Sequence, residues 1–176
     1  VDLLSLSGHK GYGPKGIGCL YINHLNMKNK INPIIFGGNQ ERGLRPGTLS
    51  VAQIVGFGEA CKILSEEMRD NVRYINSLSE NLYKKIESSI DGVKLNGSEE
   101  NRISGNLNIT FCGLNNEPLI PKLRKLAISS GSACTSASPE PSHVLEALGL
   151  NKKLIKSTIR IGIGKFNSKD EIENAA

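Results

Sequence analysis

The chain has 176 residues, enough for one domain or for a domain and part of a second. Its mean hydropathy is −0.23 and no apolar run approaches the ~18 residues of a membrane span, so we expect no membrane-spanning segment. The net charge is +5, but Lys and Arg are dispersed and aromatic residues make up only 5%, which favours a solvated basic surface over a nucleic-acid interface.

The first half of the chain is expected to hold two strands and a long helix. Residues 1–6 and 17–22 are strand-like and are joined by a loop rich in Gly and Pro. From about Val51 to Ile90, apolar residues recur at helical spacing. We expect this helix to connect a larger domain to a smaller one.

The second half is expected to alternate strands and helices. Residues 93–95 and 107–111 are predicted strands, the second because apolar and polar residues alternate in it. Residues 118–126 suit a helix with Pro near its start, residues 144–148 suit a short helix, and residues 158–163 form a last strand. This order is that of an α/β or α+β domain.

Both ends of the chain fall inside expected elements. Val1 opens directly on strand-like sequence, and Ser168 with Glu171 forms a capping box that announces a helix. Only five residues follow Glu171, too few for a stable helix. We therefore expect the chain to be a fragment.

The cysteines are too far apart for a metal or disulfide motif. They are Cys19, Cys61, Cys112 and Cys134, and no pair has C-x-x-C spacing. This gives no support to a zinc site or a disulfide framework and favours a reducing compartment. We expect Cys19 and Cys61 to lie in the core and Cys112 to pack at the end of a strand.

Cys134 has a different setting, because the surrounding run 129–138 contains only Ser, Thr, Gly and Ala besides the cysteine. A structural cysteine behaves as a small buried hydrophobe, and these neighbours would bury little. One interpretation is a nucleophilic or sulfur-carrying thiol on a loop. The other is a Ser-rich surface turn with an incidental cysteine.

Lys10 follows a strand and a turn-forming Ser7-Gly8-His9. A lysine held near a cofactor can form a Schiff base with an aldehyde, and the Ser7 and His9 side chains could hydrogen-bond a phosphate oxygen or a pyridine ring. The alternative is an ordinary surface lysine. Farther on, a Gly-rich loop ends at Thr48 just before the long helix, which suits either an anion site or a plain turn followed by an N-cap threonine.

Arg160 lies in the last predicted strand, on the face opposite three isoleucines. An arginine in that position can hold a carboxylate through two parallel hydrogen bonds. It can equally be an edge-strand arginine that reaches solvent. The sequence pattern leaves both interpretations open.

Five windows occur in the order found in cysteine desulfurases, which are pyridoxal-phosphate enzymes of the class V aminotransferase superfamily. They are Ser7–Lys10, Gly13–Gly18, Glu41–Thr48, Ser129–Ser138 and Ile159–Arg160. The long Ser-rich cysteine segment resembles the housekeeping branch that serves iron–sulfur cluster assembly. The resemblance spans the whole chain but only the second half of a family member.

The resemblance implies the aspartate-aminotransferase-type fold of pyridoxal-phosphate enzymes. Part of the large cofactor-binding domain would occupy 1–60, a connecting helix 61–90, and a truncated small α+β domain 91–176. Lys10 matches the lysine that holds the cofactor covalently. Ser7, Gly8 and His9 match cofactor contacts, and Thr48 matches the threonine that reaches the phosphate across a homodimer interface.

The resemblance also implies the reaction. Arg160 would hold the carboxylate of L-cysteine, Lys10 would move the α-proton, and Cys134 would take the sulfur as a persulfide, leaving L-alanine. The persulfide would pass to iron–sulfur scaffolds and other acceptor proteins, and could there contact a nascent cluster, with no metal intrinsic to the chain. The implied compartment is the mitochondrion or a related organelle, or alternatively the bacterial cytoplasm.

Some residues depart from the family pattern, namely Gly11, Phe36, Asn39 and Pro46. A ring-stacking histidine and an aspartate for the cofactor nitrogen would lie upstream of Val1, so we expect this piece alone to be inactive. Two other functions stay open: a related class V aminotransferase or selenocysteine lyase, which needs no Cys134, and a non-catalytic docking half.

Overall fold

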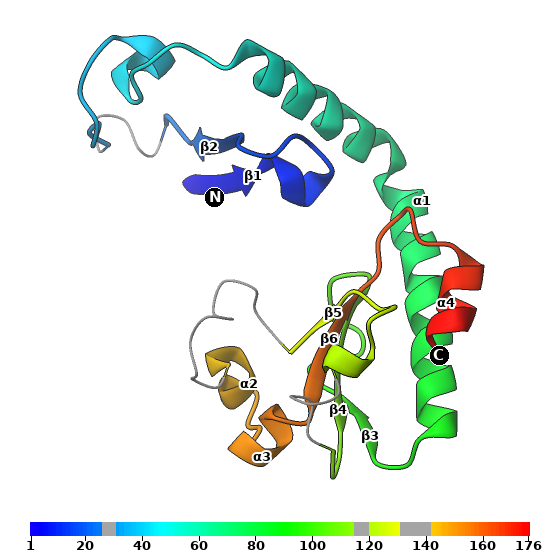
Figure 1. Ribbon diagram of the computed structural model, residues 1–176. Helices are drawn as coiled ribbons and strands as arrows, with labels where there is room; N and C mark the ends of the chain where they lie inside the picture. Colours follow the sequence, from blue (N-terminus) through cyan, green and yellow to red (C-terminus); the bar gives the residue numbers. More distant parts are fainter. Residues whose placement is uncertain (26–30, 115–119, 131–141) are drawn as a thin grey trace. The chain divides into compact units, whose positions relative to one another are not determined.

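The computed structural model describes residues 1–25, 31–114, 120–130 and 142–176. The chain divides into two compact units, Val1–Met68 (unit 1) and Arg69–Ala176 (unit 2). The long helix α1 (Val51–Ser89) contributes residues to both units (Figure 1). The expected division at 1–60, 61–90 and 91–176 stays a prediction.

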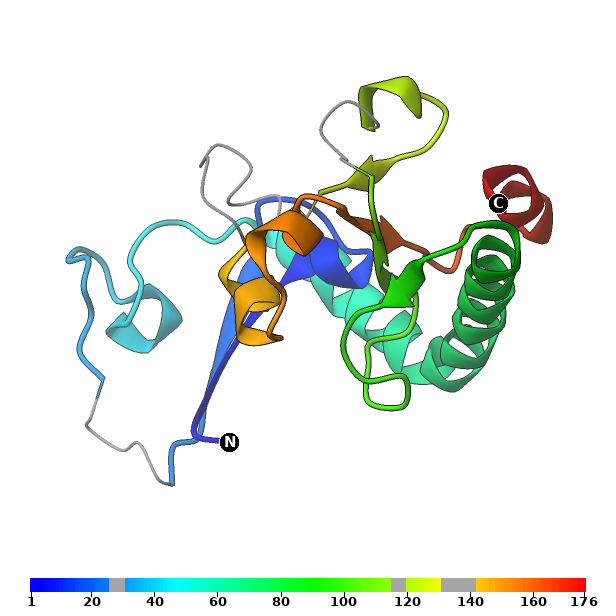
Figure 2. The ribbon, with the colours of Figure 1, turned by 90° about the horizontal axis from the view of Figure 1, so that it is seen from below.

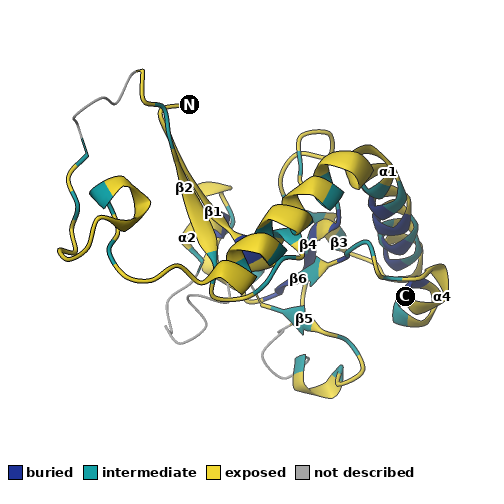
Figure 3. Ribbon diagram, turned by 90° about the horizontal axis from the view of Figure 1, so that it is seen from above, coloured by how far each residue is buried: buried dark blue, intermediate teal, exposed yellow. Residues whose placement is uncertain are grey.

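Unit 1 is built on a two-stranded antiparallel sheet of β1 (Leu3–Ser7) and β2 (Gly18–Ile22). The 3-10 helix η1 (Gly8–Gly11) leads out of β1, and a second 3-10 helix, η2 (Gln40–Gly43), lies in the segment before α1. Both strands of the pair are exposed in this chain, as Figure 3 shows.

The prediction that Cys19 and Cys61 lie in the core is wrong, because both side chains are exposed. Cys19 lies in β2, whose residues are exposed except for the partly buried Ile22. Cys61 lies in the first half of α1, and every buried residue of that helix lies in its second half. Cys112 is partly buried and follows β4 directly, as expected for a packing residue.

Unit 2 contains a four-stranded antiparallel sheet in the order β3-β4-β6-β5. The strands are β3 (Val93–Leu95), β4 (Asn106–Phe111), β5 (Ile128–Ser129) and β6 (Thr158–Gly162). β6 is paired on both sides, which fixes its backbone within the sheet.

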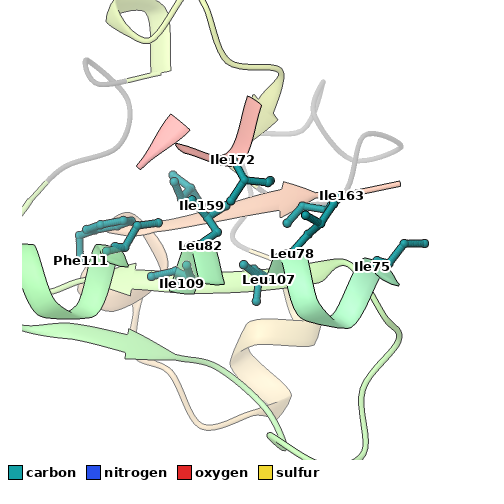
Figure 4. Close-up of a cluster of buried hydrophobic side chains, with 10 residues drawn as sticks. Ile75, Leu78, Leu82, Leu107, Ile109, Phe111, Ile159, Ile163 and Ile172 are labelled. Atoms are coloured by element: carbon teal, nitrogen blue, oxygen red, sulfur yellow. The ribbon is translucent and has the colours of Figure 1, made fainter. Parts of the chain in front are cut away.

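The core of unit 2 lies between one face of this sheet and the second half of α1 (Figure 4). Its members are buried aliphatic side chains and one phenylalanine: Ile75, Leu78, Leu82, Ile86, Leu107, Ile109, Phe111, Ile159, Ile163 and Ile172. Ile172 comes from the last helix, α4 (Lys169–Ala175), which lies alongside α1 (Figure 2). Lys85 and Asn81 of α1 both donate hydrogen bonds to the Glu173 carboxylate of α4.

Two short helices, α2 (His143–Ala147) and α3 (Lys152–Ile155), lie between β5 and β6 in the sequence. Each buries one apolar side chain, Leu145 in α2 and Ile155 in α3. The Thr158 hydroxyl at the start of β6 donates to the Leu154 carbonyl oxygen of α3, 2.7 Å away, which ties α3 to the sheet.

Most predicted elements are confirmed, including the long helix and the capping box at Ser168. In that box the Ser168 Oγ accepts from the Glu171 N–H at 3.1 Å, and the Glu171 carboxylate accepts from the Ser168 N–H at 2.9 Å. The helix predicted over 118–126 is wrong where the structure describes it, because only the 3-10 helix η3 (Ile120–Lys122) forms there. Pro121 supplies no N–H to a helical ladder. No helix in the described ranges is long and apolar enough to cross a membrane.

Candidate active site

The turn that carries Lys10 is built around Gly8, the one buried residue of η1. The Gly8 N–H donates to the Ile17 carbonyl oxygen at 2.8 Å, and the Gly8 carbonyl accepts from the Gly13 N–H at 3.0 Å. A Cβ at position 8 would lie 2.9 Å from Ile17 Cγ2 and 3.0 Å from the Pro14 carbonyl oxygen. The turn therefore closes tightly only with glycine there.

The loop after Lys10 packs against the first half of α1, within unit 1. Gln53 of α1 donates from Nε2 to the Lys15 carbonyl oxygen at 2.9 Å. A Cβ added to Gly11 would lie 2.8 Å from Leu64 Cδ1, so the loop backbone approaches the helix closely. These contacts hold the lysine-bearing turn at a fixed place on the helix.

The turn carries three polar side chains, and all of them are exposed: Ser7, His9 and Lys10. Within the described residues, none of them has a recorded side-chain hydrogen bond or ion pair. An amine, an imidazole and a hydroxyl on one rigid turn are the groups that a phosphate-bearing aldehyde with a pyridine ring requires. The donor set therefore fits pyridoxal phosphate.

Thr48 is exposed and lies in the segment between η2 and α1. The Gly47 N–H donates to Gln40 Oε1, and the Arg45 guanidinium donates to the Gly47 carbonyl oxygen, both at 3.1 Å. The first hydrogen bond of α1 runs from the Ile54 N–H to the Ser50 carbonyl at 3.0 Å. Ser50 is thus the residue before the helix, and the interpretation of Thr48 as its N-cap is wrong.

Arg160 lies in the middle of β6 in unit 2, on the sheet face opposite the buried Ile159 and Ile163. Its cross-strand partners are Asn108 on β4 and Ser129 on β5. Arg160 lines a pocket of about 340 Å³, together with Asn108 and the α2 residue Leu145 among others. The guanidinium thus belongs to a concave site rather than to an open sheet edge.

Cys134 lies outside the described residues, in the segment 131–141. The described residues on either side of that segment both belong to the Arg160 site. Ser129 is the cross-strand partner of Arg160, and Ser142 lines the same pocket. The sequence on its own does not reveal that both ends of the cysteine-bearing segment lie at the predicted carboxylate-binding arginine.

Asn108 is the pocket residue that the sequence analysis missed. It lies directly across from Arg160 on β4, and its Oδ1 accepts a hydrogen bond from Asn96 Nδ2 at 2.8 Å. The available signal was the alternation of residues 107–111, which puts Asn108 on the polar face of its strand. Pairing with Arg160 needs the strand register, which alternation does not give.

No group of three or more His, Cys, Asp or Glu within the described ranges could hold a metal ion.

Comparison with known proteins gives one consistent result. The chain is 47% identical over 175 residues to the mitochondrial cysteine desulfurase of Arabidopsis thaliana, covering 99% of this chain and 38% of that protein. It is 50% identical over 173 residues to the cysteine desulfurase IscS of Mannheimia succiniciproducens, covering 98% of this chain and 42% of that protein. The chain therefore spans about two fifths of the length of these relatives.

The fold gives the same match. The structure of a NifS-like protein from Rickettsia africae superimposes with a TM-score of 0.85 at 31% identity, covering 98% of this chain and 45% of that one. The expected α/β fold of pyridoxal-phosphate enzymes is thereby confirmed. The family model described as aminotransferase class-V matches residues 1–175. With its sequence matched almost from end to end and its fold shared with relatives, the chain belongs to the class-V aminotransferase family.

Proposed function

We propose that this chain is part of a pyridoxal-phosphate-dependent cysteine desulfurase, which takes sulfur from L-cysteine and releases L-alanine. The observation that carries the proposal is the register of β5 and β6. It pairs Arg160, a carboxylate-binding group, with Ser129, five residues before Cys134. Five residues of extended chain span at most about 18 Å. A thiol at position 134 is therefore tethered within reach of a substrate whose carboxylate Arg160 holds.

The residues of unit 1 hold the cofactor in this proposal. Lys10 would hold it through its aldehyde, Ser7 and His9 would donate hydrogen bonds to it, and Gly8 closes the turn that presents them. Thr48 contacts the phosphate of the cofactor in the other subunit of a homodimer. When bound, pyridoxal phosphate withdraws electrons from the substrate and makes its Cα–H and Cβ–S bonds breakable.

Three side chains of this protein carry out the reaction in this proposal: those of Arg160, Lys10 and Cys134. The Arg160 guanidinium orients the substrate through its carboxylate. The Lys10 amine, freed when the substrate amine takes its place, takes the proton from Cα. The Cys134 thiolate attacks the substrate sulfur, so that an S–S bond forms as the Cβ–S bond breaks. The electron pair of the broken bond remains with Cβ, and the proton given up by the Cys134 thiol completes the methyl group there. Lys10 returns its proton to Cα, which gives L-alanine.

The sulfur leaves as the outer atom of a persulfide on Cys134 and passes to acceptor proteins, with an iron–sulfur scaffold as the principal one. Two of the relatives are named for this activity, one mitochondrial and one bacterial. The proposed compartment is the mitochondrion or a related organelle, with the bacterial cytoplasm as the alternative. Fractionation of cells that express the tagged gene product distinguishes the two.

The experiment supplies L-cysteine to the complete gene product loaded with pyridoxal phosphate and measures alanine and sulfide. Cys134→Ser should abolish sulfur transfer and keep cofactor absorbance, whereas Cys61→Ser, at an exposed helix position, should leave both unchanged. Mass spectrometry should find one extra sulfur atom at position 134. A keto acid in place of sulfide would indicate an aminotransferase, and a missing cofactor absorbance would indicate a docking role. Persulfide formed on the Cys134→Ser variant would refute the assignment of the nucleophile.

A further inference from the structure

Asn108 and Thr110 on β4 face Arg160 and Thr158 on β6 as cross-strand pairs. Because residues two apart on a strand share a face, all four side chains lie on the sheet face that does not contact the main core. Thr110 and Thr158 are 1% and 0% exposed, so their hydroxyl groups must find partners within the protein. They form a hydrogen-bonded chain that ends beside Arg160.

The direction of each hydrogen bond in this chain follows from its first acceptor, the Leu154 carbonyl oxygen. Thr158 donates its one proton to that oxygen at 2.7 Å, so the Thr158 oxygen can only accept from Thr110, also at 2.7 Å. Thr110 has then used its own proton. Of its two contacts with Asn96, it therefore accepts from Nδ2 at 2.8 Å and has no proton left to donate to Oδ1 at 3.2 Å. Asn96 therefore turns its amide nitrogen toward the sheet.

The same nitrogen of Asn96 fixes the side chain of Asn108. Its second proton goes to Asn108 Oδ1 at 2.8 Å. The backbone supports this contact, because the Asn96 N–H donates to the Asn108 carbonyl at 2.8 Å and Arg102 Nη2 donates to the Asn96 carbonyl at 2.8 Å. The oxygen of the Asn108 amide is thus occupied. Its NH₂ group has no recorded acceptor in the described part of the chain.

Among the donors that line the pocket beside Arg160, the Arg160 guanidinium and the Asn108 amide come from directly paired strand positions. A carboxylate has about four lone-pair directions, and a bidentate guanidinium uses two of them. An oriented NH₂ group next to the guanidinium can fill a third. A ligand with no carboxylate has nothing there to accept both donors.

We propose that Asn108 is a second substrate-binding residue, whose Nδ2 donates to the amino-acid carboxylate that Arg160 holds. This inference rests on the proposed function, since it deepens the assignment of Arg160. It predicts that the enzyme selects α-carboxylate substrates over simple amines by two residues rather than one. Asn96 contributes by orienting the Asn108 amide and does not touch the substrate.

The test uses the complete protein with bound cofactor in the Cys134→Ser background, where sulfur transfer is blocked and equilibrium binding can be measured by calorimetry. The two probes are L-cysteine and cysteamine, which lacks the carboxylate. Asn108→Ala should weaken L-cysteine binding roughly tenfold, the worth of one hydrogen bond to a charged group, and cysteamine binding less than twofold. Asn96→Ala should give a smaller loss, again for L-cysteine alone.

Asn106→Ala is the matched control. This asparagine lines the same pocket and lies two positions earlier on the same strand, but across from Gly162 rather than Arg160. It should bind both probes as the parent does. If Asn108→Ala does not fold, Asn108→Asp has nearly the same shape and keeps the acceptor for Asn96. It should weaken L-cysteine binding and spare cysteamine. Unchanged L-cysteine binding, or equal losses for both probes, would overturn the proposal.

The failure of this inference can be told apart from the failure of the proposed function. If the protein with Cys134 intact makes no alanine and sulfide from L-cysteine, the desulfurase assignment falls whatever position 108 does. If the protein is active and its KM for L-cysteine is unchanged in Asn108→Ala, only the second carboxylate contact falls. In the expected case the KM rises roughly tenfold while kcat changes much less, since the contact is made in the bound ground state as well.

Discussion

Replacing Gly8 by alanine tests whether the turn that carries Lys10 depends on one close backbone approach. The added Cβ would lie 3.0 Å from the Ile17 carbonyl oxygen and 3.0 Å from the Pro14 carbonyl oxygen. Neither atom can rotate away as a side chain could, so the backbone itself must shift. Overpacking of this kind costs about 1–3 kcal/mol, and the lower entropy of the unfolded alanine chain returns about 0.4–1 kcal/mol. We expect a net loss of about 1–2 kcal/mol.

The same shift should weaken cofactor binding, because Lys10 follows Gly8 by two residues on the same 3-10 helix. Gly58 supplies the matched control, since it lies in α1 and a Cβ there would meet no described atom within 4 Å. Alanine in a helix interior is more stable than glycine by about 0.5–1 kcal/mol. The two Gly→Ala replacements should therefore change the free energy of unfolding in opposite directions.

The assay is urea unfolding of the complete protein, followed by equilibrium dialysis against pyridoxal phosphate. Gly8→Ala should lower the free energy of unfolding and raise the dissociation constant of the cofactor. Gly58→Ala should raise the first quantity and leave the second unchanged. A Gly8→Ala protein as stable as the parent, with the same cofactor affinity, would show that the close contact at Ile17 does not hold the turn.

Three further predictions concern unit 2. Leu82→Ala removes a core side chain that is 1% exposed and should cost about 2–5 kcal/mol in urea unfolding, whereas a loss under about 1 kcal/mol would contradict the assigned core. Thr110→Val should cost about 1–3 kcal/mol by the same measurement, because it leaves the buried Thr158 hydroxyl and the partly buried Asn96 amide each without one hydrogen-bond partner. The hydrogen bond from Lys85, and to a smaller extent that from Asn81, lowers the pKa of Glu173 below its ordinary value of 4.5. The stability that these bonds give the folded protein is therefore complete above pH 4.5 and is lost as the pH falls through the lowered pKa. The gap in melting temperature between the parent and Lys85→Ala should therefore be present at pH 7 and close toward pH 3, and a gap independent of pH would contradict the ion pair.

The features that the sequence predicted correctly are those decided by residues close together in the chain. The long helix α1 follows from apolar spacing within a few turns, and the Ser168 capping box joins residues three apart. The two faces of β6 follow from alternation alone, which separated Arg160 from its isoleucine neighbours before any partner strand was known.

The features that the sequence did not predict depend on contacts between distant residues. Burial of Cys19 was inferred from its apolar strand, but a strand is buried only when another layer packs closely on it, and Cys19 and its strand neighbours are exposed. β5 has only two residues, too few for a periodic pattern. Asn108 gains its importance from the register that pairs it with Arg160, 52 positions away in the chain. Alternation specifies a face but not a partner.

The strand register also decides where the segment that contains Cys134 begins relative to Arg160. β6 is held by hydrogen bonds to β4 on one side and β5 on the other, and its isoleucines are fixed in the core. The backbone of Arg160 therefore has little freedom, which suits the substrate-orienting role proposed for this residue. The segment with Cys134 begins directly beside it, because Ser129 is its partner on β5. A slip of β5 by one residue would turn Ser129 to the core face and move the start of that segment along the strand. The two-residue ladder at Ser129 thus sets the point, beside the proposed carboxylate-binding arginine, from which the five residues to the proposed sulfur acceptor begin.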